Sequence, residues 1–363
     1  MSGSSLDGLD LVFAEIGETS GVWGFEIVAA ACYPYEKDWK HRLQNATALT
    51  AFEYQELHAE YGRYLGEAVN RFIDEEGLHF KVAFIASHGH TTFHAPDKKL
   101  TAQLGDGAAL AAQTGLPVIS DLRALDVAFG GQGAPIVPMG EKLLLKNYDL
   151  FLNLGGIANI SFNDPENYIA FDVCPANRVL DLLAQEAGTE YDAGGALAAS
   201  GNIEHGLLKK LAALEYYQQS HPKSLDNSFG VAVVFPLVKS FNLKTADALR
   251  TYVTHVVAQI KKAIVDSEWS IQTNYQLPTT NYQLLATGGG AFNTFLITEL
   301  QTALNELFID VIVPDEKLVN YKEALIMALL GVLRWRQEYT VLPSVTGAAR
   351  GSIGGALWIG QEA

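Results

Sequence analysis

Asp172 is the residue of this sequence best placed to act as a general base. It follows an apolar run at the end of a predicted strand, within the stretch LNLGGIANISFNDPENYIAFDVCPAN at residues 152–177. A strand end holds a carboxylate rigidly, and proton abstraction requires a carboxylate fixed near the proton that it removes. We expect Pro175 to end the strand and Asn177 to cap the helix that follows. The stretch by itself also allows a second interpretation, in which Asp172 is only a solvated residue at a strand end.

Three glycine turns offer backbone amides to a phosphate group. Gly155 and Gly156 join two apolar strands, residues 288–290 (GGG) lie between an apolar strand and a helix, and residues 2–8 (SGSSLDG) precede the first strand. Because glycine has no side chain, its amide can approach an anion closely, and a helix N-terminus favours negative charge. The spacing fits neither a dinucleotide fingerprint nor a P-loop with its lysine. One glycine turn has a purely structural explanation, whereas three of them beside strand ends indicate a phosphate site.

The elements that must position these residues occur in the same order in both halves of the chain. Each half is predicted to contain a loop, meander strands, a helix, a strand, a helix and a strand. The first half has strands at 9–16, 22–33, 81–87 and 116–120 and helices at 49–76 and 107–114. The second half has strands at 151–154, 160–162, 168–172, 283–287 and 308–313, helices from 177 and 293, and an amphipathic helix with one apolar face made by Leu249, Val253, Val256, Val257, Ile260 and Ile264. We therefore expect two similar α/β halves facing one cleft, an internal duplication of architecture without visible repetition of sequence.

Composition and charge exclude several classes of protein. With 363 residues, of which 48% are hydrophobic and 18% charged, the chain is long enough for about two domains and too apolar to be disordered. The formal net charge of −16 argues against binding to nucleic acid or to an anionic membrane. Cys32 and Cys174 are too few for a disulfide framework, and no signal peptide or long apolar span occurs, so a reducing cytoplasm fits best. Cys174 could be imagined as a nucleophile, but a buried position is the more common role of such a residue.

Blocks of sequence along nearly the whole chain resemble those of one known family. In order they are MSGSSLDGLD, SHGHTTFH, TAQLGDG, DLRALDVAFGGQGAPIVP, LNLGGIANIS, FDVCPAN, YDAGGALAASG, ATGGGAFN, KEAL and LPSVTGA. By these blocks the chain is similar to the anhydro-N-acetylmuramic acid kinases of the sugar kinase, chaperone ATPase and actin superfamily. The resemblance implies an α/β fold of two similar ribonuclease-H-like (actin-like ATPase) domains flanking a nucleotide and substrate cleft. We expect an N-terminal domain of residues 1–122, joined by the C-terminal segment 342–363, and a C-terminal domain of residues 123–341 with an insertion.

The resemblance also implies a kinase of unusual chemistry. Members use ATP and Mg²⁺ to open 1,6-anhydro-N-acetylmuramic acid with water and to phosphorylate it to N-acetylmuramic acid 6-phosphate, in the recycling of peptidoglycan. An aspartate activates the water for attack at the anomeric carbon, and the freed 6-oxygen accepts the γ-phosphoryl group; the matching residue is Asp172. The implied partners are ATP and a small anhydrosugar, with no nucleic acid and no membrane, and whether the chain forms a homodimer stays open.

Further site residues are implied position by position. The positions that resemble nucleotide-binding ones are Gly3, Ser4, Ser5, Leu6, Asp7, Gly8, Asp10, Gly155, Gly156, Asn159, Gly288, Gly289 and Gly290. Of these, Asp7 and Asp10 are the expected magnesium ligands, through water. The positions that resemble sugar-binding ones are His88, Arg123, Asp126, Gln132 and Glu323, with Arg123 a natural partner for the lactyl carboxylate. A structural alternative stays open for two of them: His88 could be satisfied by backbone groups, and Glu323 could be an exposed glutamate in the first turn of a helix.

The sequence departs from the family pattern in a few places. His90 stands where glutamine is usual, and Glu141 stands where histidine is common. The family usually has an apolar strand ahead of the first glycine loop, so we expect either an upstream start or a sheet that lacks a strand. Two rival functions remain. A levoglucosan-type anhydrosugar kinase has no lactyl carboxylate to bind, so Arg123 argues against it; a catalytically inactive nucleotide-binding regulator on the same fold has no need of Asp172.

Overall fold

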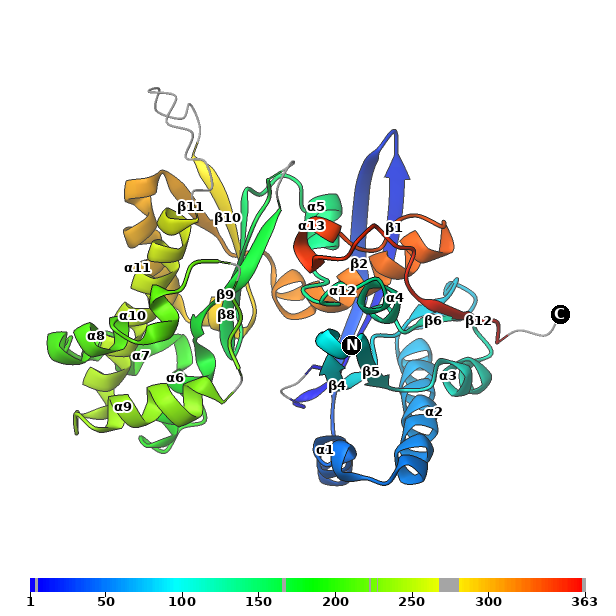
Figure 1. Ribbon diagram of the computed structural model, residues 1–363, viewed down its shortest axis with the longest axis horizontal. Coiled ribbons are helices and arrows are strands. Elements are labelled where there is room, and N and C mark those ends of the chain that lie inside the picture. Colours follow the sequence, from blue (N-terminus) through cyan, green and yellow to red (C-terminus); the bar gives the residue numbers. More distant parts are fainter. Residues whose placement is uncertain (4–5, 165–167, 222, 227, 268–280, 361–363) are drawn as a thin grey trace. The chain divides into compact units, whose positions relative to one another are not determined.

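The computed structural model describes residues 1–3, 6–164, 168–221, 223–226, 228–267 and 281–360 (Figure 1). The chain forms two compact units, made of residues 1–145 with 321–363 and of residues 146–320. Both units contain helices and strands, which confirms the predicted α/β class.

The predicted domains differ from these units in two segments, residues 123–145 and 321–341, which belong to the first unit. Arg123 donates a hydrogen bond to His88, and a β-carbon added to Gly331 would lie 2.7 Å from Cβ of Ala86. Both segments are therefore tied to the region around residue 86, a contact between distant parts of the chain that local sequence patterns do not reveal.

A five-stranded mixed sheet forms the centre of the second unit, in the order β11-β10-β7-β8-β9. The strands are β7 (Leu150–Leu154), β8 (Ile157–Phe162), β9 (Ile169–Pro175), β10 (Tyr282–Thr287) and β11 (Ile309–Ile312). Strands β7, β8 and β9 form an antiparallel meander, whereas β10 is parallel to both β7 and β11. This order is the one expected of a ribonuclease-H-like domain. The predicted strands are present, and β9 ends at Pro175 as expected, but β8 begins at Ile157, three residues before the predicted strand at 160–162.

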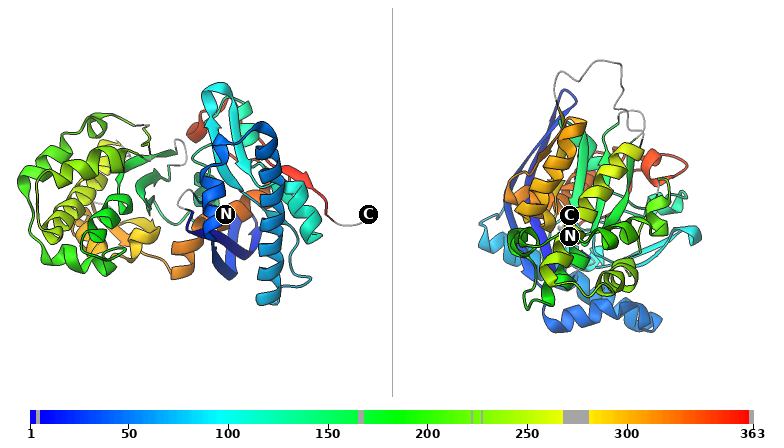
Figure 2. Two further views of the ribbon diagram at one scale, coloured as in Figure 1. Left: turned by 90° about the horizontal axis from the view of Figure 1, so that it is seen from below. Right: turned by 90° about the vertical axis from the view of Figure 1, so that its left-hand side faces the viewer.

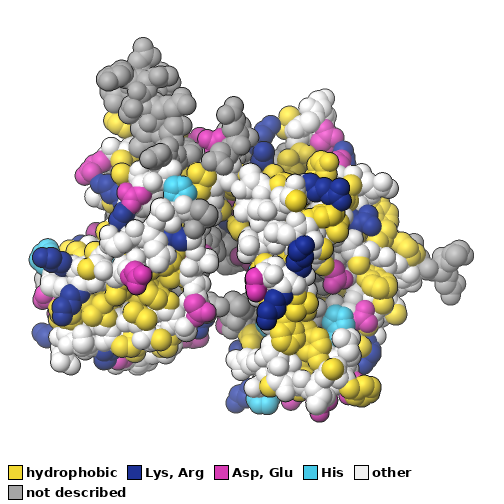
Figure 3. Space-filling model, viewed as in Figure 1, with side chains coloured by type: hydrophobic (Ala, Val, Ile, Leu, Met, Phe, Trp, Pro, Cys, Tyr) yellow, Lys and Arg dark blue, Asp and Glu magenta, His cyan; other side chains and the backbone are white. Residues whose placement is uncertain are grey.

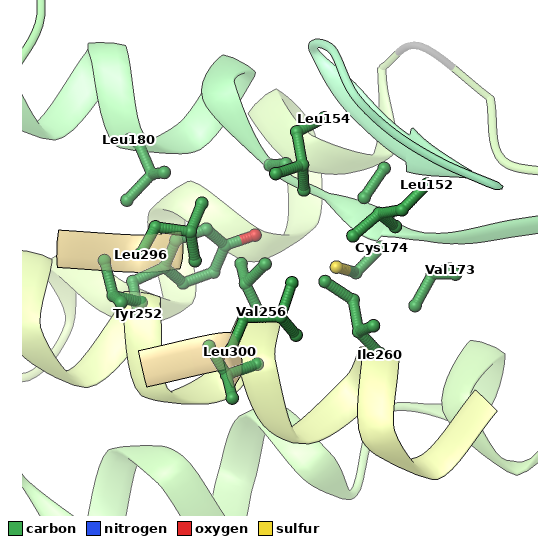
Figure 4. Packing of buried hydrophobic residues seen from close by; sticks show 14 of the residues in the cluster. Leu152, Leu154, Val173, Cys174, Leu180, Tyr252, Val256, Ile260, Leu296 and Leu300 are labelled. Atoms are coloured by element: carbon green, nitrogen blue, oxygen red, sulfur yellow. The ribbon is translucent and has the colours of Figure 1, made fainter. Parts of the chain in front are cut away.

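Helices pack against this sheet around one apolar core (Figure 1 and Figure 2). They are α6 (Asn177–Gln185), α7 (Ala196–Ser200), α8 (His205–Ala212), α9 (Phe235–Lys239), α10 (Thr245–Asp266) and α11 (Thr294–Leu304). The predicted apolar face of α10 is confirmed, because all six of its residues are buried: Leu249, Val253, Val256, Val257, Ile260 and Ile264. Figure 4 shows Val256 and Ile260 of α10 in the same core as Leu152 of β7 and Cys174 of β9. Cys174 is fully buried, so its expected role as a small core residue is confirmed.

The described strands of the first unit form a β1-β2 hairpin, a β4-β5 hairpin and a sheet in the order β12-β6-β3. Their bounds are β1 (Gly8–Thr19), β2 (Val22–Pro34), β3 (Ile85–Ala86), β4 (His90–Ala95), β5 (Leu100–Leu104), β6 (Val118–Ser120) and β12 (Ala356–Trp358). The helices are α1 (Lys37–Gln44), α2 (Ala51–Glu75), α3 (Gly107–Thr114), α4 (Ala124–Ala128), α5 (Pro138–Leu144), α13 (Pro343–Thr346) and α12 (Glu316–Trp335), which begins in the second unit. Apart from α1 and the β4-β5 hairpin inserted between β3 and α3, the first unit has the order β1, β2, α2, β3, α3, β6. This matches the order β8, β9, helices, β10, α11, β11 of the second unit, and β3 is parallel to β6 as β10 is to β11. The expected duplication of architecture is therefore present.

A groove of about 520 Å³ lies between β1 and β3 of the first unit. Residues 10–16 of β1 and residues 81–86 line it, together with side chains from α2 and α12. Strand β3 is only Ile85–Ala86, shorter than the predicted strand at 81–87. In the second unit β7 lies between β8 and β10, the counterparts of β1 and β3. The groove thus takes the place in the first unit that β7 fills in the second.

Candidate active site

The carboxylate of Asp172 is held at one oxygen and open at the other. Its Oδ2 accepts a hydrogen bond from the Leu225 amide at 2.8 Å, and among the described residues Oδ1 has no hydrogen-bond partner. The backbone of Asp172 is also held, since its amide donates to the carbonyl oxygen of Lys223 at 3.1 Å and its carbonyl oxygen accepts from the Tyr216 hydroxyl at 2.6 Å. Burial raises the pKa of Asp172, and the Leu225 hydrogen bond lowers it in part. Asp172 is thus a fixed, half-buried carboxylate within β9, and the alternative of a solvated strand end is wrong.

Asn159 lies directly opposite Asp172 on the neighbouring strand β8. The β8-β9 register shifts between Ala158 and Asn159, which is a local irregularity of the ladder. Residues that lie opposite each other on antiparallel strands project to the same face of the sheet. The sheet therefore brings together two of the residues that the sequence singled out, the expected base and a residue of the second glycine block.

The start of α6 wraps around the Gly155–Gly156 turn. The carbonyl oxygen of Gly156 accepts from the amides of Ala176 at 2.8 Å and Arg178 at 3.3 Å, and that of Gly155 accepts from the amide of Asn177 at 3.1 Å. The prediction that Asn177 caps the helix is wrong, because Ala176 is the cap and the Asn177 side-chain amide instead donates to the Leu154 carbonyl oxygen at 2.9 Å. Among the described residues the amides of Gly155 and Gly156 have no acceptor, so both are available to an anion.

The third glycine turn packs against the second. Gly288 has φ = +80°, and a β-carbon there would lie 2.5 Å from Oδ1 of Asn153. A β-carbon on Gly290 would lie 2.7 Å from Cβ of Leu154, so close packing requires glycine at both positions. Gly289 has more room, and its amide has no acceptor among the described residues. The predicted start of α11 is confirmed, because Asn293 caps it by accepting from the Leu296 amide at 3.0 Å.

A buried hydroxyl network anchors the first glycine loop in the first unit. The Ser2 hydroxyl accepts a hydrogen bond from Tyr35 at 2.8 Å and lies 3.3 Å from Nδ1 of His90, while the hydroxyls of Tyr35 and Tyr61 are 2.6 Å apart. The predicted loop residues Ser4 and Ser5 lie outside the described residues, and Leu6 is buried, with its amide donating to the Gly3 carbonyl oxygen at 3.3 Å.

Asp7 and Asp10, the expected magnesium ligands, differ in their surroundings. Asp7 is exposed, whereas Asp10 is partly buried and burial raises its pKa, with a hydrogen bond from Cys32 acting in the opposite direction. A β-carbon on Gly8 would lie 2.5 Å from Sγ of Cys32, so the backbone at Gly8, between the two aspartates, is packed tightly against Cys32. Within the part of the chain that the structure describes, no group of three or more His, Cys, Asp or Glu side chains is arranged to hold a metal ion. Mg²⁺ usually keeps several waters and takes one or two carboxylates together with phosphates, and two aspartates fit that requirement.

Arg123 and His88, both expected on the sugar side, contact each other in the first unit. Nε of Arg123 donates to Nε2 of His88 at 2.8 Å, and Nη1 of Arg123 donates to the Gly133 carbonyl oxygen at 2.5 Å. The other histidine nitrogen, Nδ1, lies 3.0 Å from the Gly89 carbonyl oxygen and donates to it, so Nε2 is free to accept. Burial and the Arg123 charge lower the pKa of His88 to about 3, which keeps the ring neutral. His88 thus orients Arg123, whose Nη2 has no partner among the described residues.

The other three expected sugar-side residues have different surroundings. Asp126 is buried, and its carboxylate accepts from the Gly133 amide at 2.7 Å and the Thr346 hydroxyl at 2.8 Å, so it holds the glycine loop that contains Gln132. Gln132 has an exposed side chain. Glu323 is half-buried on α12. Burial lowers the pKa of Arg123 to about 10, and the charge of Glu323 offsets part of this lowering. Asp126 therefore shapes the loop, while the side chains of Gln132 and Glu323 remain open to a ligand.

Two features of these sites escaped sequence reasoning. Tyr216, Lys223 and Leu225, which bond Asp172, belong to no local motif, because the contacts of Tyr216 and Leu225 with Asp172 span 44 and 53 positions; no signal in the sequence would have found them. A buried ion pair joins Lys322 to Glu141 at 2.9 Å, with side-chain exposures of 4% and 2%. The departure from the family pattern at Glu141 and the lysine of the KEAL block are the signals that could have indicated this pair.

A sheet of this strand order, with glycine amides at its strand ends that have no acceptor among the described residues and with a fixed carboxylate on β9, is typical of phosphotransferases of the actin-like ATPase type. The chain belongs to the anhydro-N-acetylmuramic acid kinase family, whose model matches residues 1–360. It is 34% identical to the anhydro-N-acetylmuramic acid kinase of Gloeobacter violaceus over 96% of this chain and 95% of that protein. It is 32% identical to that of Hydrogenovibrio crunogenus over 99% of this chain and 96% of that protein.

Family membership makes the protein a kinase of amino-sugar metabolism in cell-wall recycling, and it implies the use of ATP. A solved structure of the 2-hydroxyisocaproyl-CoA dehydratase activator from Clostridium difficile with bound ADPNP aligns at 16% identity and a TM-score of 0.33, over 61% of this chain and 69% of that one. Among the described helices, none is long and apolar enough to cross a membrane. Acidic and basic side chains are interspersed on the face of both units that Figure 3 shows.

Proposed function

We propose that the protein converts 1,6-anhydro-N-acetylmuramic acid, ATP and water into N-acetylmuramic acid 6-phosphate and ADP. The observation that supports this most is the binding of the Asp172 carboxylate, which accepts from the Leu225 amide at one oxygen and has no partner at the other among the described residues. A general base needs this arrangement, since the held oxygen sets the geometry while the free oxygen accepts the proton. The raised pKa of Asp172 strengthens it as a base relative to an exposed aspartate.

In the proposed reaction Asp172 removes a proton from water, and the water oxygen forms a bond to the anomeric carbon C1. The C1–O6 bond of the anhydro bridge breaks, and its electron pair stays on O6. The freed O6 then attacks the γ-phosphorus of ATP, and the bond from that phosphorus to the β,γ-bridging oxygen breaks to release ADP. Asp172 then gives its proton to the solvent, which restores the base. Ring opening and phosphorylation are thus coupled, because the first step generates the nucleophile of the second.

The glycine turns are proposed to bind the nucleotide phosphates. The free amides of Gly155, Gly156 and Gly289 can donate to phosphate oxygens and stabilise the charge on the transferred group. The first glycine loop, from Gly3 to Asp10, is proposed to contribute further amides, with Asp7 and Asp10 holding Mg²⁺ through water. The metal would neutralise phosphate charge when bound.

Arg123 is proposed to bind the lactyl carboxylate of the sugar. His88 and Gly133 hold its Nε and Nη1, which leaves Nη2 for an anionic group. A guanidinium in this position favours a substrate with a carboxylate over one without. Gln132 and Glu323 are proposed to contact uncharged parts of the sugar.

A coupled assay of ADP release tests this function. It is run with 1,6-anhydro-N-acetylmuramic acid and, separately, with levoglucosan, which lacks the lactyl group. We expect turnover with the muramic sugar and little with levoglucosan. Faster turnover of levoglucosan would contradict the substrate, and no turnover of either sugar would contradict the kinase activity.

A further inference from the structure

The side chain of Arg178 lies beside the Gly155–Gly156 turn. Arg178 is the second residue of α6, and its Cβ and Nε both lie 3.8 Å from where a β-carbon on Gly156 would be. The backbone amide of Arg178 donates to the Gly156 carbonyl oxygen at 3.3 Å, which ties the residue to the turn independently of its side chain. A basic side chain thus runs along one of the turns whose amides are free.

The aliphatic part of this side chain is confined on a second side. A β-carbon on Gly230 would lie 3.5 Å from Cγ of Arg178 and 3.1 Å from Cβ of Pro175. The stem therefore passes between two glycines, Gly156 and Gly230, and a β-carbon at Gly230 would be in ordinary van der Waals contact with it. A confined stem limits the positions that the guanidinium can reach and lowers the entropy cost of using it.

No described side chain neutralises the charge of Arg178. Among the described residues its guanidinium makes no hydrogen bond and no ion pair, although the chain carries a formal net charge of −16. The amides at the start of α6 do not substitute for it, because those of Ala176, Asn177 and Arg178 already donate to the turn. An anion at this turn would therefore meet the amides of Gly155 and Gly156 and one unpaired cation.

We infer that Arg178 binds the polyphosphate of the nucleotide at the Gly155–Gly156 turn. This inference rests on the proposed function, and it adds a charged side chain to a site otherwise made of amides and a metal. In an acidic protein, a polyanionic ligand needs a local positive charge to offset the repulsion by the rest of the chain. A guanidinium can donate two parallel hydrogen bonds to a phosphate, which an ammonium cannot.

Calorimetric titration of ATP and of adenosine tests the inference with four proteins: wild type, Arg178→Gln, Arg178→Lys and Lys209→Gln. Lys209 is an exposed lysine of α8, so Lys209→Gln removes one positive charge from the same unit away from the turn. We expect Arg178→Gln to weaken ATP binding by about ten-fold to a hundred-fold, with Arg178→Lys intermediate, because a charge-assisted contact is lost. Adenosine binding should be unchanged in every variant, and Lys209→Gln should bind ATP like wild type.

Two results would overturn the inference. One is unchanged ATP affinity in Arg178→Gln, and the other is an equal loss for ATP and adenosine, which would indicate a structural role. The proposed function fails separately, when wild type binds ATP but does not turn over the anhydro sugar. A wild type that binds no ATP would overturn both. Because Arg178 is exposed, melting temperatures of the variants should match wild type.

Discussion

Replacing Asp172 by asparagine separates a catalytic carboxylate from a structural one. Asparagine keeps the shape and can still accept the Leu225 amide, which now lies 2.8 Å from Oδ2. It loses the charge assistance of that hydrogen bond, worth about 1 kcal/mol. Burial also destabilises the charged carboxylate of Asp172, as its raised pKa shows, and the neutral amide of asparagine removes this cost. These two effects oppose each other, so the free energy of unfolding should change by no more than about 1 kcal/mol.

The effect of the same substitution on turnover should be far larger. Removing a general base typically costs about a hundred-fold to ten-thousand-fold in rate. At 1.36 kcal/mol for each factor of ten, this is about 2.7 to 5.4 kcal/mol of transition-state stabilisation. Activation energy and stability should therefore respond to Asp172→Asn by clearly different amounts.

The assay measures ADP release with saturating anhydro sugar, ATP affinity by calorimetry and the melting temperature. Asp226→Asn is the matched control, because Asp226 is an exposed aspartate next to the Leu225 clamp. We expect ATP affinity and melting temperature near wild type in both variants and a loss of turnover only in Asp172→Asn. Turnover above about a tenth of wild type in Asp172→Asn would refute the role of Asp172, given the usual size of a general-base contribution.

Three further predictions concern pH, a buried ion pair and the groove. The value of kcat/KM should fall as pH drops through the raised pKa of Asp172, because only the ionised form accepts a proton. If the same fall at low pH persists in Asp172→Asn, another group causes it. In the wild type the buried ammonium of Lys322 lies 2.9 Å from the carboxylate of Glu141. Glu141→Gln removes this counter-charge and should lower the free energy of unfolding, measured by urea titration, by about 3–5 kcal/mol. A loss below about 1 kcal/mol would mean that the pair acts like one at the surface. Joining an apolar strand-forming segment of about six residues to Met1 should raise the melting temperature by roughly 2–4 °C per kcal/mol gained, because β3 and the part of β1 beyond Asp10 have no strand partner on the groove side among the described residues. Equal melting temperatures with a Gly/Ser segment of the same length would show that the groove does not bind a strand.

Local patterns in the sequence were enough to locate most elements. The apolar spacing along α10 and the apolar runs of β7, β8 and β9 reflect which residues of each element are buried. That information lies within the element itself. Asn293 was also correctly expected to begin a helix, because capping involves residues only three positions apart.

Contacts between distant segments could not be predicted in this way. Asn177 was expected to cap α6, yet its side chain bonds the carbonyl oxygen of Leu154, 23 positions away. Asp126 resembles a sugar-binding residue, and its carboxylate also accepts from Thr346, 220 positions away, which holds a loop that local patterns do not reveal. In both cases a polar side chain satisfies a group brought near by the fold, and no local pattern encodes which group that is.

The mass of the product tests the coupling of ring opening to phosphorylation most directly. Wild-type protein is incubated with ATP, Mg²⁺ and 1,6-anhydro-N-acetylmuramic acid, and the sugar products are identified by mass spectrometry alongside the ADP released. The proposed reaction predicts a single product heavier than the substrate by one water and one phosphoryl group, formed in equal amount to ADP. A phosphorylated sugar that keeps its anhydro bridge, or an opened sugar without phosphate, would contradict it.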